Sequence, residues 1–283
     1  MSTDLASGKL VLDEPADRVT RLRIDHEARR GALDHEILDA LADCVRSLDA
    51  RCLLLTGTGS MFSAGYDLGN LEGQTREERS PIGDRASTER PDSFEEDAER
   101  LVAHPFHSAI EALEAFPYPA IAALNGHAIG GGLELALTCD IRIAAQGVKV
   151  GMPPAKLGLV YSHTGLRKFL ELCGPAHTAE LFYAGRNVDA DRGQEIGLVN
   201  HVVEAEELEQ TALSMATEIA ANAPLSLAGN KRIIRTLRAH EGALPSDVER
   251  QLVELRESCF RSEDFREGVR AFGEKRKPEW KGR

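Results

Sequence analysis

The segment Ala120–Asp140, AIAALNGHAIGGGLELALTCD, constrains the fold of this chain more than any other part of it. The apolar run at 120–125 is typical of a strand buried on both faces, and a glycine-rich turn at Gly126–Gly132 leads into an apolar helix over Leu133–Thr138. The first turn of a helix leaves backbone N–H groups without partners and is electropositive. Glycines there let a ligand approach the backbone closely. The segment therefore predicts a backbone site for a negatively charged oxygen.

A carboxylate stands close to this predicted site in the sequence. Glu134 lies three residues after Gly131, on about the same face of the helix, which pairs an oxyanion donor with an acid/base group. Two alternatives remain open: the glycines permit tight packing of helix on strand, or Glu134 is a structural carboxylate paired with a buried arginine. A dinucleotide site is disfavoured, because the spacing is not GxGxxG.

A second turn offers another backbone donor. The buried run Cys52–Thr56 is followed by the segment Ser60–Leu68, SMFSAGYDL. A small residue before glycine exposes the N–H group of Ala64. Two N–H groups from two strand-end turns are what a two-donor oxyanion hole requires.

The order of predicted elements indicates a mixed core followed by a helical tail. Strand and helix patterns alternate up to about residue 205, while 69–100 is polar and reads as an excursion over a pocket. We predict a core over 1–205 and an all-helical region over 206–283. The individual predictions are strands at 9–12, 19–24, 52–56, 120–125, 141–145, 148–152 and 199–203, and helices at 35–48 with Asp34 as cap, 101–116, 133–138, 164–172 and 176–183.

Charge and cysteine content exclude several classes of function. A net charge of −12 repels nucleic acid, and it would also repel a polyanionic ligand unless local Lys or Arg side chains intervene. The five cysteines form no CxxC pair and read as reduced, buried thiols. No apolar run approaches the ~20 residues of a membrane span, so we expect a cytoplasmic protein without membrane contact. His104 and His107 lack a third ligand, so no metal site is expected.

The sequence resembles the crotonase (enoyl-CoA hydratase/isomerase) superfamily. FSAGYDL and PAIAALNGHAIGGGLELALTCDIRIAA are similar to its two signature segments, and the likeness extends through AGRNVDADRGQEIGLVNHVV to SEDFREGVRAFGEKRKPEWKGR. This resemblance implies an α/β fold, with a crotonase-like ββα spiral core and a C-terminal helical trimerisation region. It also implies a homotrimer or a dimer of trimers acting on an acyl-CoA, with coenzyme A as part of the substrate and no separate cofactor.

The resemblance assigns roles to individual residues. The N–H groups of Ala64 and Gly131 would hold the thioester oxygen as the enolate forms, and Glu134 matches the first of two catalytic glutamates. Arg30 would supply positive charge to coenzyme A, although Gly31 replaces the common Asn. The remaining residues implied in binding coenzyme A or the acyl group are Ala32, Leu33, Tyr66, Asp67, Leu68, Gly130, Pro154, Phe272 and Lys275.

One position departs from the hydratase pattern. The second glutamate would fall at Pro154, and neither Ala155 nor Lys156 supplies the carboxylate of the isomerase variant, which disfavours hydration by two carboxylates. Tyr161 matches a tyrosine of the methylmalonyl-CoA decarboxylases in this superfamily, although those carry histidine in place of Tyr66.

Three functions therefore stay open: an enoyl-CoA hydratase/isomerase-type enzyme, a decarboxylase of a malonyl-type CoA and a non-catalytic acyl-CoA binder. Tyr161 is either catalytic or a core tyrosine. Tyr66 reads as a pocket-wall residue. His127 and His163 read as packed or capping residues.

Overall fold

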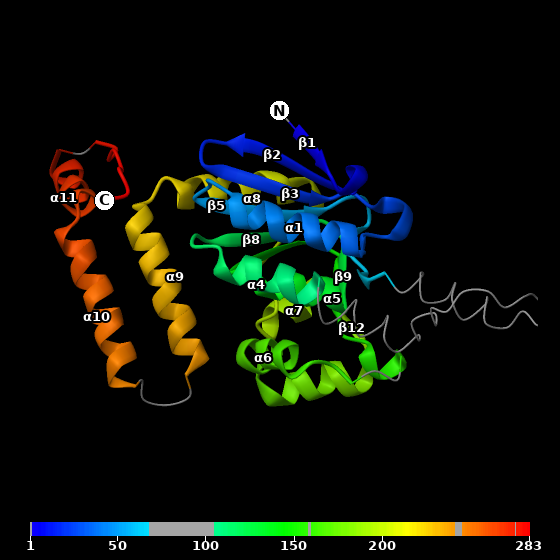
Figure 1. The fold of residues 1–283 in the computed structure, drawn as a ribbon. Coiled ribbons are helices and arrows are strands. Elements are labelled where there is room, and N and C mark those ends of the chain that lie inside the picture. Colours follow the sequence, from blue (N-terminus) through cyan, green and yellow to red (C-terminus); the bar gives the residue numbers. More distant parts are fainter. Residues whose placement is uncertain (1, 68–104, 158–159, 241–244, 275) are drawn as a thin grey trace, which may run out of the picture.

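The fold consists of three sheets flanked by helices, and the computed structural model describes residues 2–67, 105–157, 160–240, 245–274 and 276–283 (Figure 1). A seven-stranded sheet has the order β1-β2-β3-β5-β8-β10-β13, and a four-stranded sheet has the order β12-β11-β9-β6. The third sheet consists of two short strands, β4 and β7.

Three successive strand pairs build the core. Each pair gives its first strand to the seven-stranded sheet and its second to the four-stranded sheet, with parallel pairing between successive turns of the chain. The pairs are β5 (Cys52–Gly57) and β6 (Met61–Ser63), β8 (Ala120–Leu124) and β9 (His127–Ile129), and β10 (Ile141–Ala145) and β11 (Lys149–Gly151). The first strands are almost wholly apolar because both of their faces are covered.

Antiparallel strands and one helix precede this core. β1 (Ser2–Leu5), β2 (Leu10–Ala16) and β3 (Val19–Ile24) extend the large sheet, and β3 pairs with β5 in parallel. α1 (His35–Ser47) begins where the sequence predicted, because the Asp34 carboxylate accepts a hydrogen bond of 2.9 Å from the Ile37 N–H group. β4 (Ala32–Leu33) pairs with β7 (Gly65–Tyr66), which ties residues 30–33 to the predicted donor turn.

The glycine-rich segment folds differently from the single turn predicted over Gly126–Gly132. β9 occupies part of it, and α5 (Gly131–Thr138) begins two residues before Leu133. Gly130 turns the chain with φ +56° and ψ −125°, a conformation that L side chains rarely adopt. Gly131 is therefore the first residue of the helix, and its amide lies in the turn that lacks intrahelical acceptors.

Two further helices enclose α5. α4 (His107–Ala115) lies within the helix predicted over 101–116, of which 101–104 fall outside the described residues. The two helices predicted over 164–172 and 176–183 are one kinked helix, α6 (His163–Ala184), with Gly174 at φ +71° before Pro175. A short 3-10 helix, η4 (Pro154–Leu157), precedes α6. The elements after α6 are β12 (Asn187–Asp189), α7 (Ala190–Glu195), β13 (His201–Val203) and the 3-10 helix η5 (Ala205–Glu207).

The helical tail has two parts. α8 (Leu208–Ala220) packs on the large sheet, where Leu208, Ala212 and Ala216 join the core cluster. All of the described strands lie before residue 205, whereas the core cluster continues into α8. α9 (Pro224–Ala239), α10 (Ser246–Arg261) and α11 (Glu263–Glu274) lie to one side of it (Figure 1). Every helix in the described part of the chain is too short or too polar to cross a bilayer.

Candidate active site

The two predicted donor turns meet at Gly65 and Gly131. A Cβ atom built on Gly65 would lie 3.0 Å from the Gly131 amide nitrogen and 2.9 Å from the Ile129 carbonyl oxygen, and Gly65 has φ +91°. Both the space and the backbone conformation therefore require glycine at 65. The Glu134 N–H donates to the Gly130 carbonyl at 3.1 Å, which is the first hydrogen bond within helix α5. The amides of residues 131–133 come before this bond and therefore have no acceptor within the helix.

The structure corrects the assignment of Ala64 as a donor. Its N–H group donates to the carbonyl oxygen of Arg30 at 3.1 Å and is therefore engaged within the fold. The N–H group of Asp67 likewise donates to the Leu33 carbonyl, at 3.0 Å. The Gly65 N–H donates to the Ser63 hydroxyl at 3.1 Å. Since adjacent amides point to opposite sides of a strand, the amide of Tyr66, next to Asp67, is the one expected to face away from β4. The small-residue–glycine pattern carries no information about the backbone that pairs with this turn, so it selected an amide that is already hydrogen-bonded.

Glu134 lies on α5 with its side chain buried, 3% exposed. The Tyr161 hydroxyl donates a short hydrogen bond to one oxygen of this carboxylate. Burial raises the pKa of Glu134, and the Tyr161 hydrogen bond and the nearby charge of Lys168 only partly offset that effect. Burial also raises the pKa of Tyr161 well above its ordinary value. The pair thus joins a carboxyl group with a raised pKa to a neutral phenol.

Gly165 makes room for this pair. A Cβ atom there would lie 2.5 Å from Cε1 of Tyr161 and 3.0 Å from both carboxylate oxygens of Glu134. Its amide donates to the Ser162 hydroxyl at 3.1 Å, which caps the start of α6. Sequence reasoning did not select Gly165, although serine three residues before it is a recognisable helix start.

Tyr66 closes the space in front of Gly131. A Cβ atom on Gly131 would lie 3.2–3.4 Å from the Cζ, Cε2 and Cε1 atoms of the Tyr66 ring. The ring packs edge to face on Phe106 with centroids 4.8 Å apart, and its hydroxyl end interacts with Tyr161. Burial, followed by the charge of Glu134, raises the pKa of Tyr66. This arrangement agrees with the interpretation of Tyr66 as a wall.

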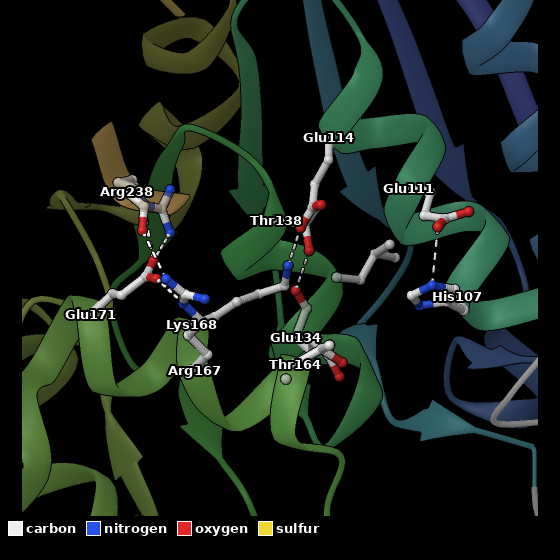
Figure 2. Close-up of polar contacts among 12 residues, drawn as sticks. His107, Glu111, Glu114, Glu134, Thr138, Thr164, Arg167, Lys168, Glu171 and Arg238 are labelled. Carbon is white, nitrogen blue, oxygen red and sulfur yellow. Dashed lines mark hydrogen bonds and ion pairs between the residues drawn. The ribbon is translucent and has the colours of Figure 1, made fainter. Parts of the chain in front are cut away.

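A cluster of charged side chains lies one helical turn further along α5, beside Thr138. Figure 2 shows Lys168 of α6 reaching Glu114 of α4 beside Thr138, while Glu171 lies between Arg167 and Arg238. A cavity of about 270 Å³ adjoins these groups. Sequence reasoning missed Lys168 and Glu114, because no local pattern links positions 54 residues apart.

The residues implied in binding coenzyme A are only partly described. Arg30 is exposed in the left-handed conformation (φ +58°), whereas Ala32 and Leu33 are buried, with His26 Nδ1 3.0 Å from the Ala32 carbonyl oxygen. Asp67 forms an ion pair of 2.5 Å with Arg29, which fixes the donor loop. Leu68 and Lys275 lie outside the described residues, as does the side chain of Phe272.

The structure also describes most of the other residues that the sequence analysis singled out. Pro154 is buried at the start of η4. His127 caps a neighbouring strand, since its Nδ1 accepts from the Lys149 N–H at 3.0 Å, while His163 is exposed at the start of α6. His107 pairs with Glu111 at 3.0 Å, and His104 lies outside the described residues. The cysteines that the structure describes as free are Cys44, Cys52, Cys139 and Cys173.

Comparisons with known proteins agree with this arrangement. The enoyl-CoA hydratase/isomerase family model matches residues 88–283. A probable enoyl-CoA hydratase of Bacillus subtilis is 32% identical over 264 residues, covering 91% of this chain and 93% of that protein. The methylmalonyl-CoA decarboxylase of Escherichia coli is 31% identical, covering 94% of this chain and 95% of its own. The crystal structure of an enoyl-CoA hydratase from Bacillus anthracis superposes with a TM-score of 0.84 at 29% identity, covering 97% of this chain and 100% of that one.

This chain belongs to the enoyl-CoA hydratase/isomerase family, within the crotonase superfamily. The predicted α/β fold with a crotonase-like core is confirmed. The chain is accordingly an enzyme of that family.

Proposed function

We propose that this enzyme binds an acyl-CoA thioester and stabilises the enolate formed from it. The amides of Gly131 and Tyr66 would hold the thioester oxygen, and Glu134 would exchange the proton. The proposal rests on the close approach of Gly65 to the Gly131 amide. One helical turn after Gly131 lies Glu134, which is buried and hydrogen-bonded to Tyr161. Each donor of such a hole typically lowers the barrier by about 2.7–4 kcal/mol.

The site offers one carboxylate, that of Glu134, for acid/base catalysis. Pro154 cannot transfer a proton, so the geometry offers no second acid/base carboxylate where hydratases of this family have one. A carboxyl group with a raised pKa, hydrogen-bonded to a phenol, suits a single proton transfer to or from the carbon next to the thioester. We therefore place enolate formation, as in double-bond isomerisation, ahead of hydration.

Decarboxylation of a malonyl-type CoA is the second candidate. The specific observation that favours it is the Tyr161 hydroxyl at the carboxylate of Glu134, supported by the 31% identity to a methylmalonyl-CoA decarboxylase. The bond to the departing carboxylate would break, its electron pair would enter the enolate, and CO₂ would leave. A proton would then be added to the carbon.

A substrate panel with matched variants tests the proposal. Purified enzyme is offered crotonyl-CoA, a 3-enoyl-CoA and methylmalonyl-CoA, and hydration, isomerisation and CO₂ release are measured. Glu134→Gln should lower proton-transfer turnover by about 10²–10⁴-fold, whereas the exposed Glu180→Gln on α6 should not. Rapid hydration that survives Glu134→Gln would contradict the role of Glu134. Tight binding of coenzyme A esters without turnover would favour a non-catalytic binder.

We also propose a homotrimer or dimer of trimers in the cytoplasm, as the family resemblance implies. Light scattering of the purified chain tests the assembly, and a monomeric mass would contradict it.

A further inference from the structure

The side chain of Tyr66 adjoins both parts of the candidate site. Its outer ring atoms face the Cα atom of Gly131 closely enough that a single added carbon there would lie 3.2–3.4 Å away. The hydroxyl end of the same ring lies near Tyr161 and the charge of Glu134. The ring therefore borders both the candidate oxyanion donor and the candidate acid/base.

Neighbouring groups hold this ring in place. Phe106 packs against it with ring centroids 4.8 Å apart and an interplanar angle of 73°. β7 fixes its backbone through the pairing of Tyr66 with Leu33, and Phe106 itself is only 4% exposed. A ring packed on a buried aromatic partner does not yield easily, because protein interiors are packed at crystal-like density.

We propose that Tyr66 limits the length of the acyl group, so that the site accepts short-chain acyl-CoA esters and excludes long ones. The inference rests on the proposed function, since it assumes that the thioester oxygen lies at the Gly131 amide. An acyl chain bound there directs its next carbons toward Glu134 and meets the ring of Tyr66. Further methylenes have to displace the ring from Phe106, which is an overpacking cost.

Binding of saturated esters tests this limit without depending on catalysis. Calorimetric titrations compare acetyl-CoA, butyryl-CoA and octanoyl-CoA for the wild-type enzyme and for Tyr66→Ala. A hydrophobic pocket discriminates one methylene by about 10–200-fold, so the wild-type enzyme should bind butyryl-CoA at least about tenfold more tightly than octanoyl-CoA. Tyr66→Ala keeps the backbone amide and should abolish or reverse that preference.

Three further variants identify the cause. Tyr66→Phe keeps the ring and loses the hydroxyl, so it should retain the wild-type preference for short chains. Tyr66→Leu, a less disruptive replacement than alanine, should show partial relief of the limit. Tyr183→Ala removes a tyrosine that is 83% exposed on α6 and should bind as the wild type does.

The possible outcomes separate this inference from the proposed function. Equal affinity for all esters in the wild type, unchanged in Tyr66→Ala and Tyr66→Leu, would overturn the length limit alone. Loss of the preference in Tyr66→Phe would also overturn it, because the ring would then not be the cause. No detectable binding of any ester by any variant would overturn the proposed function and the length limit together.

Discussion

The uncharged side of the site, at Glu134, and its charged side, one helical turn away beside Thr138, treat carboxylates in opposite ways. On one side Glu134, 3% exposed, faces the hydroxyl groups of tyrosines, and burial raises its pKa. On the other side burial also acts to raise the pKa of Glu171, but hydrogen bonds from Arg238 and Arg167 outweigh it and lower that pKa. A carboxylate with cationic partners is held in its charged form, whereas one beside neutral donors remains ready to take or release a proton.

The comparison also shows that the two sides are coupled. Lys168 pairs with Glu114 beside Thr138, yet its charge also acts on Glu134, one helical turn away. The charged side therefore holds the pKa of Glu134 below the value that burial alone would impose. Substitutions on each side test how far this coupling extends.

The largest loss of turnover in this comparison is expected from a substitution at Gly165, where the uncharged side of the site is tightly packed. Gly165→Ala would force the Tyr161 ring away from Glu134, since the new Cβ atom lies 2.5 Å from that ring. A displacement of about 1 Å can lower turnover by about 100-fold, which steady-state kinetics would detect.

Gly193→Ala is the matched control, because Gly193 lies in another helix, α7, and its nearest neighbours are aliphatic side chains at 3.3 Å. Equal activity of the two alanine variants would show that the Tyr161–Glu134 geometry does not matter for turnover.

Removal of the phenol hydroxyl alone should have the next largest effect. Tyr161→Phe deletes a hydrogen bond that lowers the pKa of Glu134, so that pKa should rise further. Where Glu134 acts as a base, turnover is lost as pH falls through its pKa, and the acidic limb of the pH–rate profile should therefore move to higher pH. Turnover at neutral pH should fall by about 10- to 100-fold, in line with the ~1.5–3 kcal/mol of a hydrogen bond to a charged group. An unshifted limb, as expected for the exposed control Tyr183→Phe, would contradict this account.

Substitutions of Lys168 and Glu114 should move the same limb in opposite directions. Lys168→Met removes a charge that lowers the pKa of Glu134, so the acidic limb should move to higher pH. Glu114→Gln removes a charge that raises this pKa, so the limb should move to lower pH, while His107 on α4 still acts to lower it. We expect changes of a few-fold in turnover near the limb, because the charges act from beyond hydrogen-bond contact.

Lys149→Met, at an exposed position, is the control for loss of a lysine. Shifts in the same direction for Lys168→Met and Glu114→Gln would show that packing, rather than charge, links the two sides.

The smallest effect is expected at the outer ion pair. Arg238→Gln breaks the 2.6 Å contact with Glu171, but the Arg238 side chain is 46% exposed. Exposed pairs typically contribute about 0–1 kcal/mol, so thermal unfolding should change little and turnover should not change. A large loss of turnover would mean that the charged side controls Glu134 as a unit.

Prediction from sequence succeeded where the signal was local. The strand β5, the capped start of α1 and the first strand of the signature, β8, all followed from apolar period and capping residues at neighbouring positions. The glycine-rich turn and Glu134 were selected for the same reason. The start of α5 was missed by two residues, because glycine has a low helix propensity that tertiary packing overrides.

Prediction failed where a group's partner came from elsewhere in the chain. The sequence indicated a free amide at Ala64, but Arg30, 34 positions earlier, accepts from it. The Lys168–Glu114 pair and the room that Gly165 leaves for Tyr161 are likewise contacts between separate elements. No periodicity reports such contacts, because it describes which face of an element is apolar and not what lies against it.

The sequence by itself determined the strand–turn–helix segment, the carboxylate within it and the proline at 154, since these are properties of residue identity and spacing. Only the tertiary structure decided that the Ala64 amide is engaged by Arg30, and only it set Tyr161 and Tyr66 around Glu134. The physical reason is that a hydrogen bond or a pKa depends on every group within a few ångströms, and folding brings those groups from distant positions.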